Sequence, residues 1–346
     1  MNGNSLTVLM PVYNASRHLR LAINSILNQS FTDFEFLIID DASTDLSVEI
    51  VRSYSDPRIK LVINEKNLGI SKTLNKGIEM ASCELIARMD ADDISYPQRL
   101  QLQFEYFKKH PETVLLSTSV KLITNDGDLM EEFISNRYYN CYFLNFFCVL
   151  YHPTIMYKKS AILSNGGYTM TYSEDFDLWW RLLTGNNIIG HIDTILLDYR
   201  YSDTSLFRVL KKKEYELAIF ETVARNLKYY TGDEITLSHE EIDFLQNQFE
   251  PILKMSDTTA IINCFKKLDF INDKIFHKPN INYTSSSLRP YAAIKKETSF
   301  YYYYTRLPRK DALYLLLSIY PVSYLFKRMW VYIKRYRSRF TTSVAI

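Results

Sequence analysis

The sequence predicts an α/β fold with a mostly parallel, Rossmann-like sheet flanked by helices, followed by a helical C-terminal region. Short apolar runs alternate with helical patterns through about the first 90 residues, which is typical of βαβ units. Polar residues cluster just after several of these runs, where the carboxyl ends of parallel strands meet. After residue 205 the chain shows helical periodicity only.

The N-terminal elements alternate regularly. Each expected strand is a short apolar run, and each expected helix carries apolar residues at a spacing of three or four. The expected strands cover residues 6–10, 34–39, 59–64, 85–89 and 114–119. The expected helices cover residues 18–28, 43–54, 71–80 and 98–110, with Pro97 at the start of the last.

The rest of the chain is less regular. Asn125-Asp126-Gly127 has strong turn chemistry, and Ser173 suits the N-cap of a helix with Phe176 and Trp179 on one face. An apolar strand is expected from residue 152 to 157, and two strands are expected over 188–201. Helices are expected over 209–229, 238–249 and 256–268, with polar breaks at 231–233 and 283–287. The aromatic stretch 138–151 is expected in the core, with an apolar wall facing an acceptor as the alternative.

The charge distribution is uneven, although the net charge of the chain is only +2. Residues 289–340 contain 12 Lys/Arg and 2 Asp/Glu, so this segment carries +10 and the rest of the chain carries −8. The four cysteines show no CxxC pairing, which favours a reduced cytosolic protein with buried thiols over a disulfide framework. The N-terminus lacks a basic segment followed by an apolar core, so no secretory signal is expected.

Three carboxylates follow the strand expected at residues 85–89. Asp90, Asp92 and Asp93 occupy four consecutive positions and repel one another unless a cation or a hydrogen-bond donor lies among them. Oxygen-only ligands favour Mg²⁺ or Mn²⁺ over zinc. An Asp-rich turn is the alternative interpretation of these residues taken alone.

The usual phosphate-binding loops are absent from the sequence. No GxGxxG follows the first strand, and no GxxxxGK[ST] occurs anywhere in the chain. A nucleotide would therefore need other groups: Asp41 to accept a pyrimidine ring N–H, Tyr13 to stack on the base, and a metal at Asp92 to neutralise the diphosphate. Asp41 and Ser43 also look like an ordinary helix start.

Four segments in order and in register resemble the family-2 glycosyltransferases of the GT-A fold, of the bacterial surface-polysaccharide type. They are MPVYN at 10–14, IIDDAS at 38–43, NLGISKTLNKG at 67–77 and ARMDADD at 87–93. The resemblance implies a DxD motif at Asp90-Ala91-Asp92, with Asp90 near the ribose and Asp92 on Mn²⁺ or Mg²⁺. It also implies a donor site that binds the nucleotide-sugar, formed by Pro11, Tyr13, Asn14, Asp41, Asn67, Gly69 and Asn75. Cys83 replaces a glycine that is common in the family.

The resemblance continues to residue 205. It includes the HPT segment at 152–154 and the ED motif at Glu174-Asp175, in which Asp175 is the implied general base. Acids in the first turn of a helix are also favoured by the helix dipole, whatever the function. Tyr199-Arg200 matches a segment in which the family has a histidine at the position of Ser202. His152 and His191 are candidates to replace it, although such histidines are more often structural. Asp93, Glu174, His152 and Arg200 are expected in supporting roles.

The implied reaction needs two kinds of carboxylate. Attack of an acceptor hydroxyl opposite a departing nucleoside diphosphate inverts the anomeric centre and requires one proton to be removed. The leaving group requires charge neutralisation, which a metal at Asp92 supplies. We therefore expect an inverting hexosyl- or N-acetylhexosaminyltransferase that uses a UDP-sugar in capsule or lipopolysaccharide biosynthesis. The alternative is a non-catalytic nucleotide-sugar-binding or assembly subunit.

The basic C-terminal end suggests contact with a membrane surface. The uncharged run 312–326 contains Pro321 and is too short for a confident span. After it, Phe326, Trp330 and Ile333 share one helical face, with basic residues elsewhere around the helix, which suits an anionic bilayer. Nucleic acid and a plain core helix are the rival interpretations, and no nucleic-acid motif is present.

The resemblance and the charge distribution together predict three parts. Residues 1–205 form the GT-A donor-binding and catalytic domain, 206–288 a helical region, and 289–346 a basic aromatic tail. The expected location is the cytoplasm, at the inner face of the cytoplasmic membrane. The expected acceptor is a saccharide or a lipid-linked saccharide.

Overall fold

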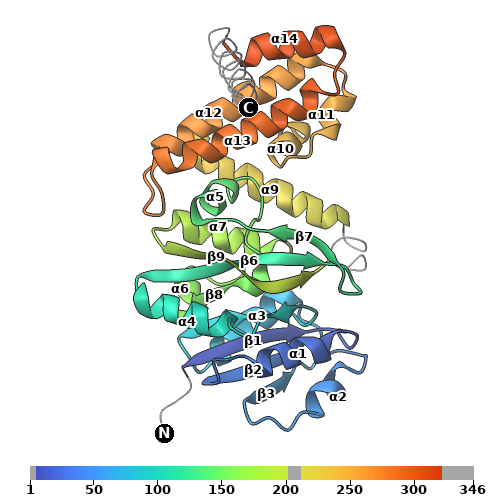
Figure 1. Ribbon diagram of the computed structural model, residues 1–346, viewed down its shortest axis with the longest axis vertical. Helices are drawn as coiled ribbons and strands as arrows, with labels where there is room; N and C mark the ends of the chain where they lie inside the picture. Colours follow the sequence, from blue (N-terminus) through green and yellow to red (C-terminus); the bar gives the residue numbers. More distant parts are fainter. Residues whose placement is uncertain (1–4, 202–211, 322–346) are drawn as a thin grey trace, which may run out of the picture. The chain divides into compact units, whose positions relative to one another are not determined.

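The computed structural model describes residues 5–201 and 212–321, and the chain forms two compact units (Figure 1). The first unit comprises the described residues up to Tyr229 together with Lys278–Tyr291. The second comprises Tyr230–His277 together with the described residues from Ala292 onward. The first unit includes residues on both sides of the expected boundary at 205, and the three-part division stays a prediction.

A nine-stranded mixed sheet organises the first unit. The order of the strands is β3-β2-β1-β4-β8-β6-β9-β5, and β7 pairs with β6. Parallel pairing joins β3, β2, β1 and β4, whereas β8 pairs antiparallel with both β4 and β6. The strands are β1 (Leu6–Val12), β2 (Phe34–Asp40), β3 (Ile59–Ile63), β4 (Leu85–Arg88), β5 (Ile94–Ser95), β6 (Thr113–Ile123), β7 (Leu129–Phe133), β8 (Met156–Lys158) and β9 (Ile188–Arg200).

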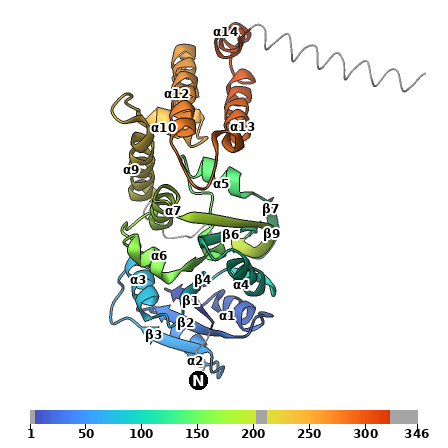
Figure 2. The same cartoon turned by 90° about the vertical axis from the view of Figure 1, so that its left-hand side faces the viewer.

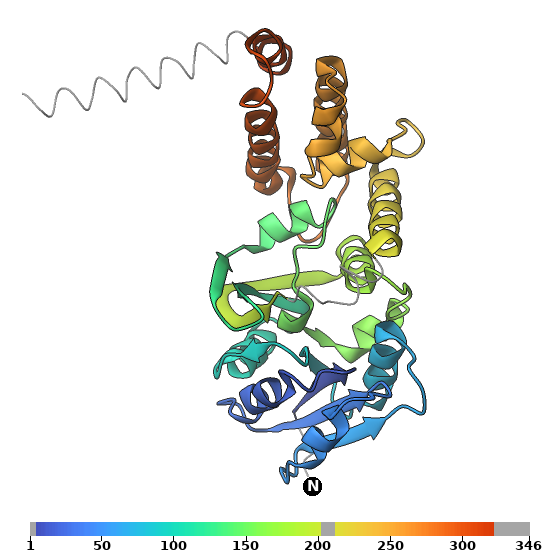
Figure 3. The ribbon, with the colours of Figure 1, turned by 90° about the vertical axis from the view of Figure 1, so that its right-hand side faces the viewer.

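Helices cover both faces of this sheet. Figures 2 and 3 show α1 and α4 on one side of the strands, and α3 and α6 on the other. The helices of the unit are α1 (Leu19–Leu27), α2 (Ser47–Arg52), α3 (Ile70–Met80), α4 (Arg99–Lys109), α5 (Arg137–Phe143), α6 (Lys159–Ser164), α7 (Glu174–Thr184) and α9 (Lys212–Thr231), with a 3₁₀ turn η1 (His152–Thr154). The expected α/β class with a sheet covered on two faces is confirmed.

Strand alternation explains why both faces of β1 are apolar. Val8 and Met10 pack in one core cluster with residues of α1 and α4. Leu9 points to the other face, where α3 approaches so closely that a Cβ at Gly77 would lie 2.4 Å from Leu9 Cδ1. Successive strand residues point to opposite faces, so a strand buried on both sides reads as a continuous apolar run.

The strand order creates a switch point beside β1. The chain passes from β1 to β2 and β3 on one side, and then returns to place β4 on the other side of β1. Ligands of open α/β sheets bind beyond the carboxyl strand ends at such a point. The segments after β1, β2 and β4, with their conspicuous polar residues, therefore meet at one edge.

The expected elements differ from the observed ones in several places. The region where two strands are expected, 188–201, forms a single strand, β9, which ends at Arg200 and whose pairing with β6 shifts register. The HPT segment forms the 3₁₀ turn η1 instead of opening a strand. Within the stretch 138–151, Tyr142, Phe143 and Phe146 are buried, which confirms core packing for these three side chains.

The second unit is helical. It contains α10 (His239–Leu245), α11 (Glu250–Lys254), α12 (Thr258–His277) and α14 (Arg309–Ile319), and most of α13 (Ser285–Tyr304). Phe244 lies at its centre in ring contact with Phe249, Phe265 and Tyr303. The helix expected over 238–249 ends at Leu245, the one expected to end at 268 continues to His277, and α13 begins at Ser285 inside an expected break.

The expected membrane contact falls mostly on residues that the structure does not describe. Ser202 and the basic aromatic segment 326–336 lie outside the described residues. Within the described ranges, no helix combines the length and the apolar character that crossing a membrane requires.

Candidate active site

The loops after β1 and β2 are joined by Asn14. Its side-chain oxygen accepts the backbone N–H of Thr44 at 2.8 Å, and its own N–H donates to Ser43 Oγ at 3.0 Å. Asn14 has φ +48°, a left-handed conformation that asparagine tolerates better than most residues. Pro11 is buried in β1, and the neighbouring Tyr13 is 42% exposed. An aromatic ring is thus presented at the switch point.

Asp41 is buried and organises the loop before α3. Its Oδ1 accepts from Asn64 Nδ2 at 2.7 Å and from the Leu68 N–H at 2.9 Å, and its Oδ2 accepts from the Gly69 N–H at 2.9 Å. Gly69 adopts φ +83°, which only glycine reaches without strain, and thereby starts α3. A carboxylate has about four acceptor positions, so one is left for a ligand N–H.

The helix-start interpretation of Asp41 and Ser43 is wrong. Helix α2 begins at Ser47, and the Ser47 N–H is accepted by Asp45. Asp41 belongs instead to the loop of residues 64–69, because its hydrogen-bond partners come from that segment.

Asn67 and Asn75, both expected at the donor site, have different environments. Asn67 is exposed on the loop before α3. Asn75 donates from Nδ2 to the Tyr168 carbonyl at 2.8 Å and accepts the Tyr168 N–H at 2.9 Å. Asn75 therefore fastens α3 to the loop before α7, and it can shape a donor site through that loop.

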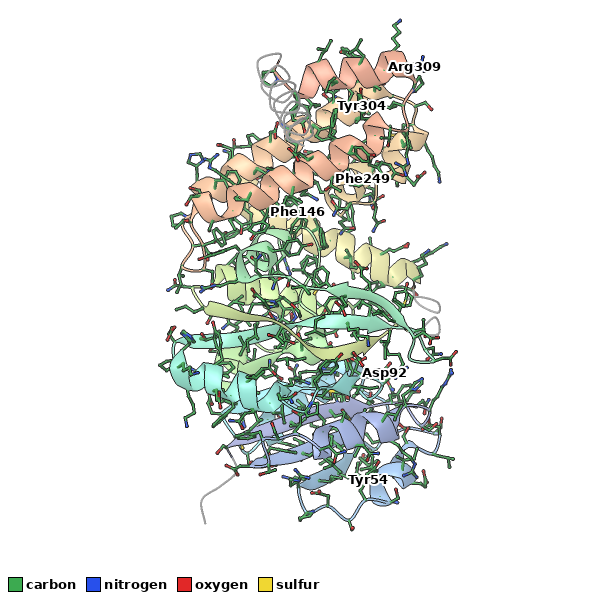
Figure 4. The ribbon with its side chains drawn as sticks, viewed as in Figure 1. Tyr54, Asp92, Phe146, Phe249, Tyr304 and Arg309 are labelled. Carbon is green, nitrogen blue, oxygen red and sulfur yellow. The ribbon has the colours of Figure 1, made fainter. Side chains whose placement is uncertain are left out.

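The acidic cluster follows β4, and Figure 4 labels Asp92 among the strands of the first unit. Asp90 forms an ion pair with Arg88 Nη1 and is partly exposed. The adjacent Ala91 is buried. Asp93 is buried, and its Oδ1 accepts the Arg200 N–H at 2.7 Å. Asp92 lies between these two anchored carboxylates.

Burial and mutual repulsion change the acidity of this cluster. Burial, reinforced by the Asp90 carboxylate, raises the pKa of Asp92 to about 6. Burial, with Asp92 and Asp90 as further causes, raises the pKa of Asp93 well above its ordinary value. Negative charge is therefore concentrated in a buried setting here, which is a setting that a divalent cation stabilises.

Arg88 was not singled out from the sequence, although it lies at the centre of the site. Its side chain is 2% exposed, and its Nε has no hydrogen-bond partner among the described residues. Its positive charge lowers the pKa of Asp92 on one side and those of Glu174 and Asp175 on the other. A buried arginine directly before an acidic cluster is the signal that marks it in the sequence.

Glu174 and Asp175 start α7. Burial and then the Asp175 charge raise the pKa of Glu174 to about 8, and burial raises the pKa of Asp175. Asp175 is half-buried, its Oδ1 accepts the Phe176 N–H at 2.7 Å, and its Oδ2 lies 3.7 Å from Cys148 Sγ. Ser173 occupies the N-cap position in a left-handed conformation, but its side chain makes no capping hydrogen bond, contrary to expectation.

The two histidines are held by other groups. His152 Nε2 is 2.8 Å from the Tyr168 hydroxyl, and its Nδ1 is 3.9 Å from Glu174 Oε1. Burial lowers the pKa of His152 well below its ordinary value, so the ring is neutral. His191 lies 2.8 Å from Ser117 Oγ, beside Ser135 and Asn140. No contact joins either ring to Asp92 in the part of the chain that the structure describes.

The side chain of Arg200 supports the acidic cluster by donating hydrogen bonds to backbone carbonyls. Its Nε donates to the Asp92 carbonyl at 2.9 Å, and its Nη1 donates to the carbonyls of Thr124 at 3.1 Å and Asn125 at 2.8 Å. The guanidinium therefore joins the DxD segment to the turn after β6. This contact explains how β9 can position residues that follow β4.

Asp177 is a second buried acid that was not assigned a role from the sequence. It receives Arg181 Nε at 2.9 Å, Thr169 Oγ1 at 3.0 Å and Arg225 Nη1 at 2.5 Å. Arg181 also donates to the Gly167 carbonyl at 2.6 Å. Asp177 thus fixes α7 against α9 and against the loop that carries Tyr168, which orients the start of α7.

The residues present fit a cation that is shared with a ligand. Across residues 5–201 and 212–321, no three or more His, Cys, Asp or Glu side chains form a group that could hold a metal by itself. Mg²⁺ and Mn²⁺ with nucleotides are commonly held by one or two carboxylates, and phosphate oxygens complete the shell. Asp92 is buried beside the Asp90 carboxylate, and both causes raise its pKa, which is a setting that a bound cation would stabilise.

Several known proteins are similar to this chain. The family model of glycosyl transferase family 2 matches residues 7–163. The chain is 33% identical over 244 residues to an uncharacterized glycosyltransferase of Methanocaldococcus jannaschii, covering 67% of this chain and 84% of the relative. It is 30% identical over 234 residues to the O-antigen biosynthesis glycosyltransferase WbnJ of Escherichia coli, covering 65% and 88%.

A third relative and two solved structures extend the comparison. UDP-Glc:alpha-D-GlcNAc-diphosphoundecaprenol beta-1,3-glucosyltransferase WfgD of Escherichia coli is 29% identical over 62% of this chain and 85% of its own. TarS 1–349 of S. aureus with UDP-GlcNAc has a TM-score of 0.54 at 16% identity, over 85% of this chain and 89% of its own. The mannosyltransferase PcManGT of Pyrobaculum calidifontis, with GDP-Man and Mn²⁺, has a TM-score of 0.50 at 14% identity, over 96% and 85%. The structures support the GT-A fold, and the sequence matches show that this chain is an enzyme that belongs to glycosyl transferase family 2.

Proposed function

We propose that this protein is an inverting, metal-dependent glycosyltransferase that moves a hexosyl or N-acetylhexosaminyl group from a UDP-sugar to a saccharide acceptor. The observation that carries this proposal is that the Arg88 guanidinium acts on carboxylates of both acidic segments. One buried guanidinium influences both Asp92 after β4 and Asp175 at the start of α7. A candidate metal ligand and a candidate base therefore lie around the same cation.

The donor side is formed by the loops after β1 and β2. Tyr13 is available to stack on the base, and the buried Asp41 retains one acceptor position for a ring N–H. The name of WfgD includes UDP-Glc, and TarS was solved with UDP-GlcNAc, which support a uridine nucleotide. PcManGT was solved with GDP-Man, so the screen described below includes guanosine donors.

Asp92 is the proposed ligand of Mn²⁺ or Mg²⁺, with Asp90 beside it near the ribose. When bound, the cation neutralises the charge that develops on the departing diphosphate. Asp93 and Arg200 hold the backbone of this segment in place, because they link it to β9 and to the turn after β6. Preorganisation of this kind places the charged groups before the donor arrives.

Asp175 is the proposed general base. Its half-buried carboxylate takes the proton of the acceptor hydroxyl as that oxygen attacks the anomeric carbon from the face opposite the diphosphate. Burial raises the pKa of this group towards the working pH, which favours both acceptance and later release of a proton. Glu174 supports Asp175 and lies 3.9 Å from His152.

The acceptor is proposed to be a lipid-linked saccharide of a polysaccharide pathway, used at the inner face of the cytoplasmic membrane. The name of WfgD specifies a diphosphoundecaprenol acceptor, and the name of WbnJ specifies O-antigen biosynthesis. Helix α14 exposes Leu313, Tyr314 and Leu317 by more than half of their surfaces, and the following 25 residues contain six Lys/Arg and no acid. Apolar and basic groups together suit an anionic bilayer.

Cosedimentation with liposomes tests the membrane part of the proposal. The full chain is expected to sediment with vesicles that contain anionic lipid and to be released at high salt, because charge attraction is screened. A chain ending at Arg309 should remain in the supernatant. Equal sedimentation of the two chains would contradict an anchor in the C-terminal segment.

A thermal-stability screen of UDP- and GDP-sugars, with and without Mn²⁺, tests the central proposal. A ligand that binds only the folded state raises the melting temperature, so UDP-sugars with Mn²⁺ are expected to give the largest increase. The stabilising donor is then assayed for transfer and for hydrolysis. Stabilisation without turnover under any metal would favour the non-catalytic subunit, which the serine at position 202 and the engaged His152 and His191 motivate.

A further inference from the structure

Cys148 lies directly beside the proposed base. Its Sγ is 3.7 Å from Asp175 Oδ2 and 3.5 Å from the Leu150 carbonyl oxygen. Cys148 is exposed, whereas Cys83, Cys141 and Cys264 are buried. Nothing in the sequence distinguishes these four thiols, because Cys148 and Asp175 come together only in the folded chain.

The two oxygens of Asp175 have different partners. Oδ1 accepts the N–H of the next residue, Phe176, at 2.7 Å, a contact that belongs to the first turn of α7. Oδ2 faces the thiol of Cys148, which comes from a different segment of the chain. Rotation of the carboxylate about its Cβ–Cγ bond is therefore limited by one backbone donor and one side-chain donor.

The thiol is suited to donate in this position. The Asp175 carboxylate lies 3.7 Å from the sulfur, and a neighbouring negative charge disfavours the thiolate, so the sulfur keeps its proton. A protonated thiol is a weak donor with a single hydrogen. That hydrogen has two acceptors in reach, the Leu150 carbonyl and Asp175 Oδ2, and the ionised carboxylate is the stronger of them.

We propose that Cys148 is a positioning residue for the transfer reaction: its thiol donates to Asp175 Oδ2 and holds the carboxylate in the orientation that takes the proton of the acceptor hydroxyl. The inference deepens the proposed function, because it rests on Asp175 as the base. Cys148 itself exchanges no proton with the substrate. Its effect is exerted on the geometry and the acidity of Asp175.

The charged groups around Asp175 determine the direction of the expected pH effect. Arg88 on β4 favours the ionised form of Asp175, and the thiol hydrogen bond does the same. On α7 itself, Glu174 is the neighbouring acid, and Asp90 after β4 acts on Glu174. Removal of the thiol leaves the other groups in place and takes away one contact that favours the charged carboxylate. The pKa of Asp175 should then rise, and the acid limb of the kcat profile should move to higher pH.

Three variants of the full chain test this inference: Cys148→Ala removes the donor, Cys148→Ser restores a donor of similar size, and Cys264→Ala is the matched control in the second unit. For Cys148→Ala we expect kcat to fall about three- to tenfold, a small share of the about 10²- to 10⁴-fold that a general base supplies. The KM for the donor should stay unchanged, and the acid limb should shift upward. Cys148→Ser should recover most of the rate, and Cys264→Ala should match the unaltered chain.

The results separate this inference from the proposed function. If Asp175→Asn is inactive while Cys148→Ala keeps the unaltered kcat and pH profile, only the role of Cys148 is overturned. If Asp175→Asn is active, Asp175 is not the base and both proposals fail. A lower melting temperature for Cys148→Ala without a shift of the acid limb would show a packing role and would also overturn the inference.

Discussion

The two acidic regions of the first unit differ in how their carboxylates are held. After β4, Asp90 is paired with Arg88, and Asp93 accepts the backbone N–H of Arg200 on a neighbouring strand. At the start of α7, Asp175 is held by the N–H of the next residue and by a weak thiol donor. The strand-end acids are therefore fixed by an ion pair and by a backbone donor from β9, whereas Asp175 is fixed by the next backbone N–H and by a weak thiol donor from a different segment.

This difference matches the two tasks that the proposed reaction assigns. A group that holds a cation must stay in place, and the contacts of Asp90 with Arg88 and of Asp93 with the backbone of β9 favour this on either side of Asp92. A group that takes a proton must be able to exist in both protonation states near the working pH. Burial without a strong ion pair produces that condition at Asp175, whose pKa is raised. The contrast predicts that removing a charge from one region lowers the transfer rate by a different factor than removing a charge from the other.

The largest effect is expected for Asp92→Asn. This change keeps the shape of the side chain and removes the charge that would hold the cation, so metal-dependent kcat/KM should fall about a thousandfold or more. Transfer rates measured across a range of Mn²⁺ concentrations check this, with Asp56→Asn as the control, because Asp56 pairs with Arg58 in the loop that precedes β3. Unaltered turnover in Asp92→Asn would remove Asp92 from the site.

Asp175→Asn should have the next largest effect. Loss of the base is expected to lower kcat about 10²- to 10⁴-fold while donor binding persists. In the unaltered enzyme, activity should rise with pH through a value above the ordinary range of an aspartate, because burial raises the pKa of Asp175 and the ionised form is the active one. Initial rates from acid to neutral pH check both statements. An acid limb at the ordinary aspartate value would contradict this assignment.

The smallest of the three effects is expected for Asp41→Ala. Asp41 follows β2, on the side of β1 away from the acidic cluster after β4. Asp41 accepts three hydrogen bonds from the loop before α3, so its removal loosens that loop and takes away the acceptor proposed for the base. Affinity for UDP should fall about ten- to a hundredfold, since a hydrogen bond to a charged group contributes about 1.5–3 kcal/mol. Calorimetric titration with UDP measures this. Nucleotide affinity equal to that of the unaltered chain would count against a base pocket at Asp41.

Arg88 links the two acidic regions electrostatically despite their separation in the chain. Its guanidinium favours the ionised forms of Asp92, Glu174 and Asp175. A buried arginine is costly unless carboxylates surround it, and several buried carboxylates are costly without a cation. Each group therefore depends on the others. The effects of removing Asp92 and Asp175 on the rate are expected to be non-additive when both are replaced in one chain.

Local sequence patterns were enough to predict the class of fold, the alternation of strands and helices, and the edge at which polar residues gather. These follow from local patterns: apolar runs of strand length, helical spacing, and acids placed just after Arg88 in β4 and at the start of α7. The site residues singled out in this way were Asp41, Asp90, Asp92 and Asp175, and their roles stay predictions. Local patterns are sufficient here because side-chain direction in strands and helices is set by backbone geometry.

The partner of each functional side chain, by contrast, could be identified only in the folded chain. Asn75 bonds the Tyr168 backbone, His152 meets the Tyr168 hydroxyl, and Cys148 meets Asp175, across separations that no local pattern records. Arg88 likewise became central only when β4 and α7 were brought together. Hydrogen bonds and buried charges depend on groups that are distant in sequence and a few ångströms apart in space, and folding alone specifies those pairs.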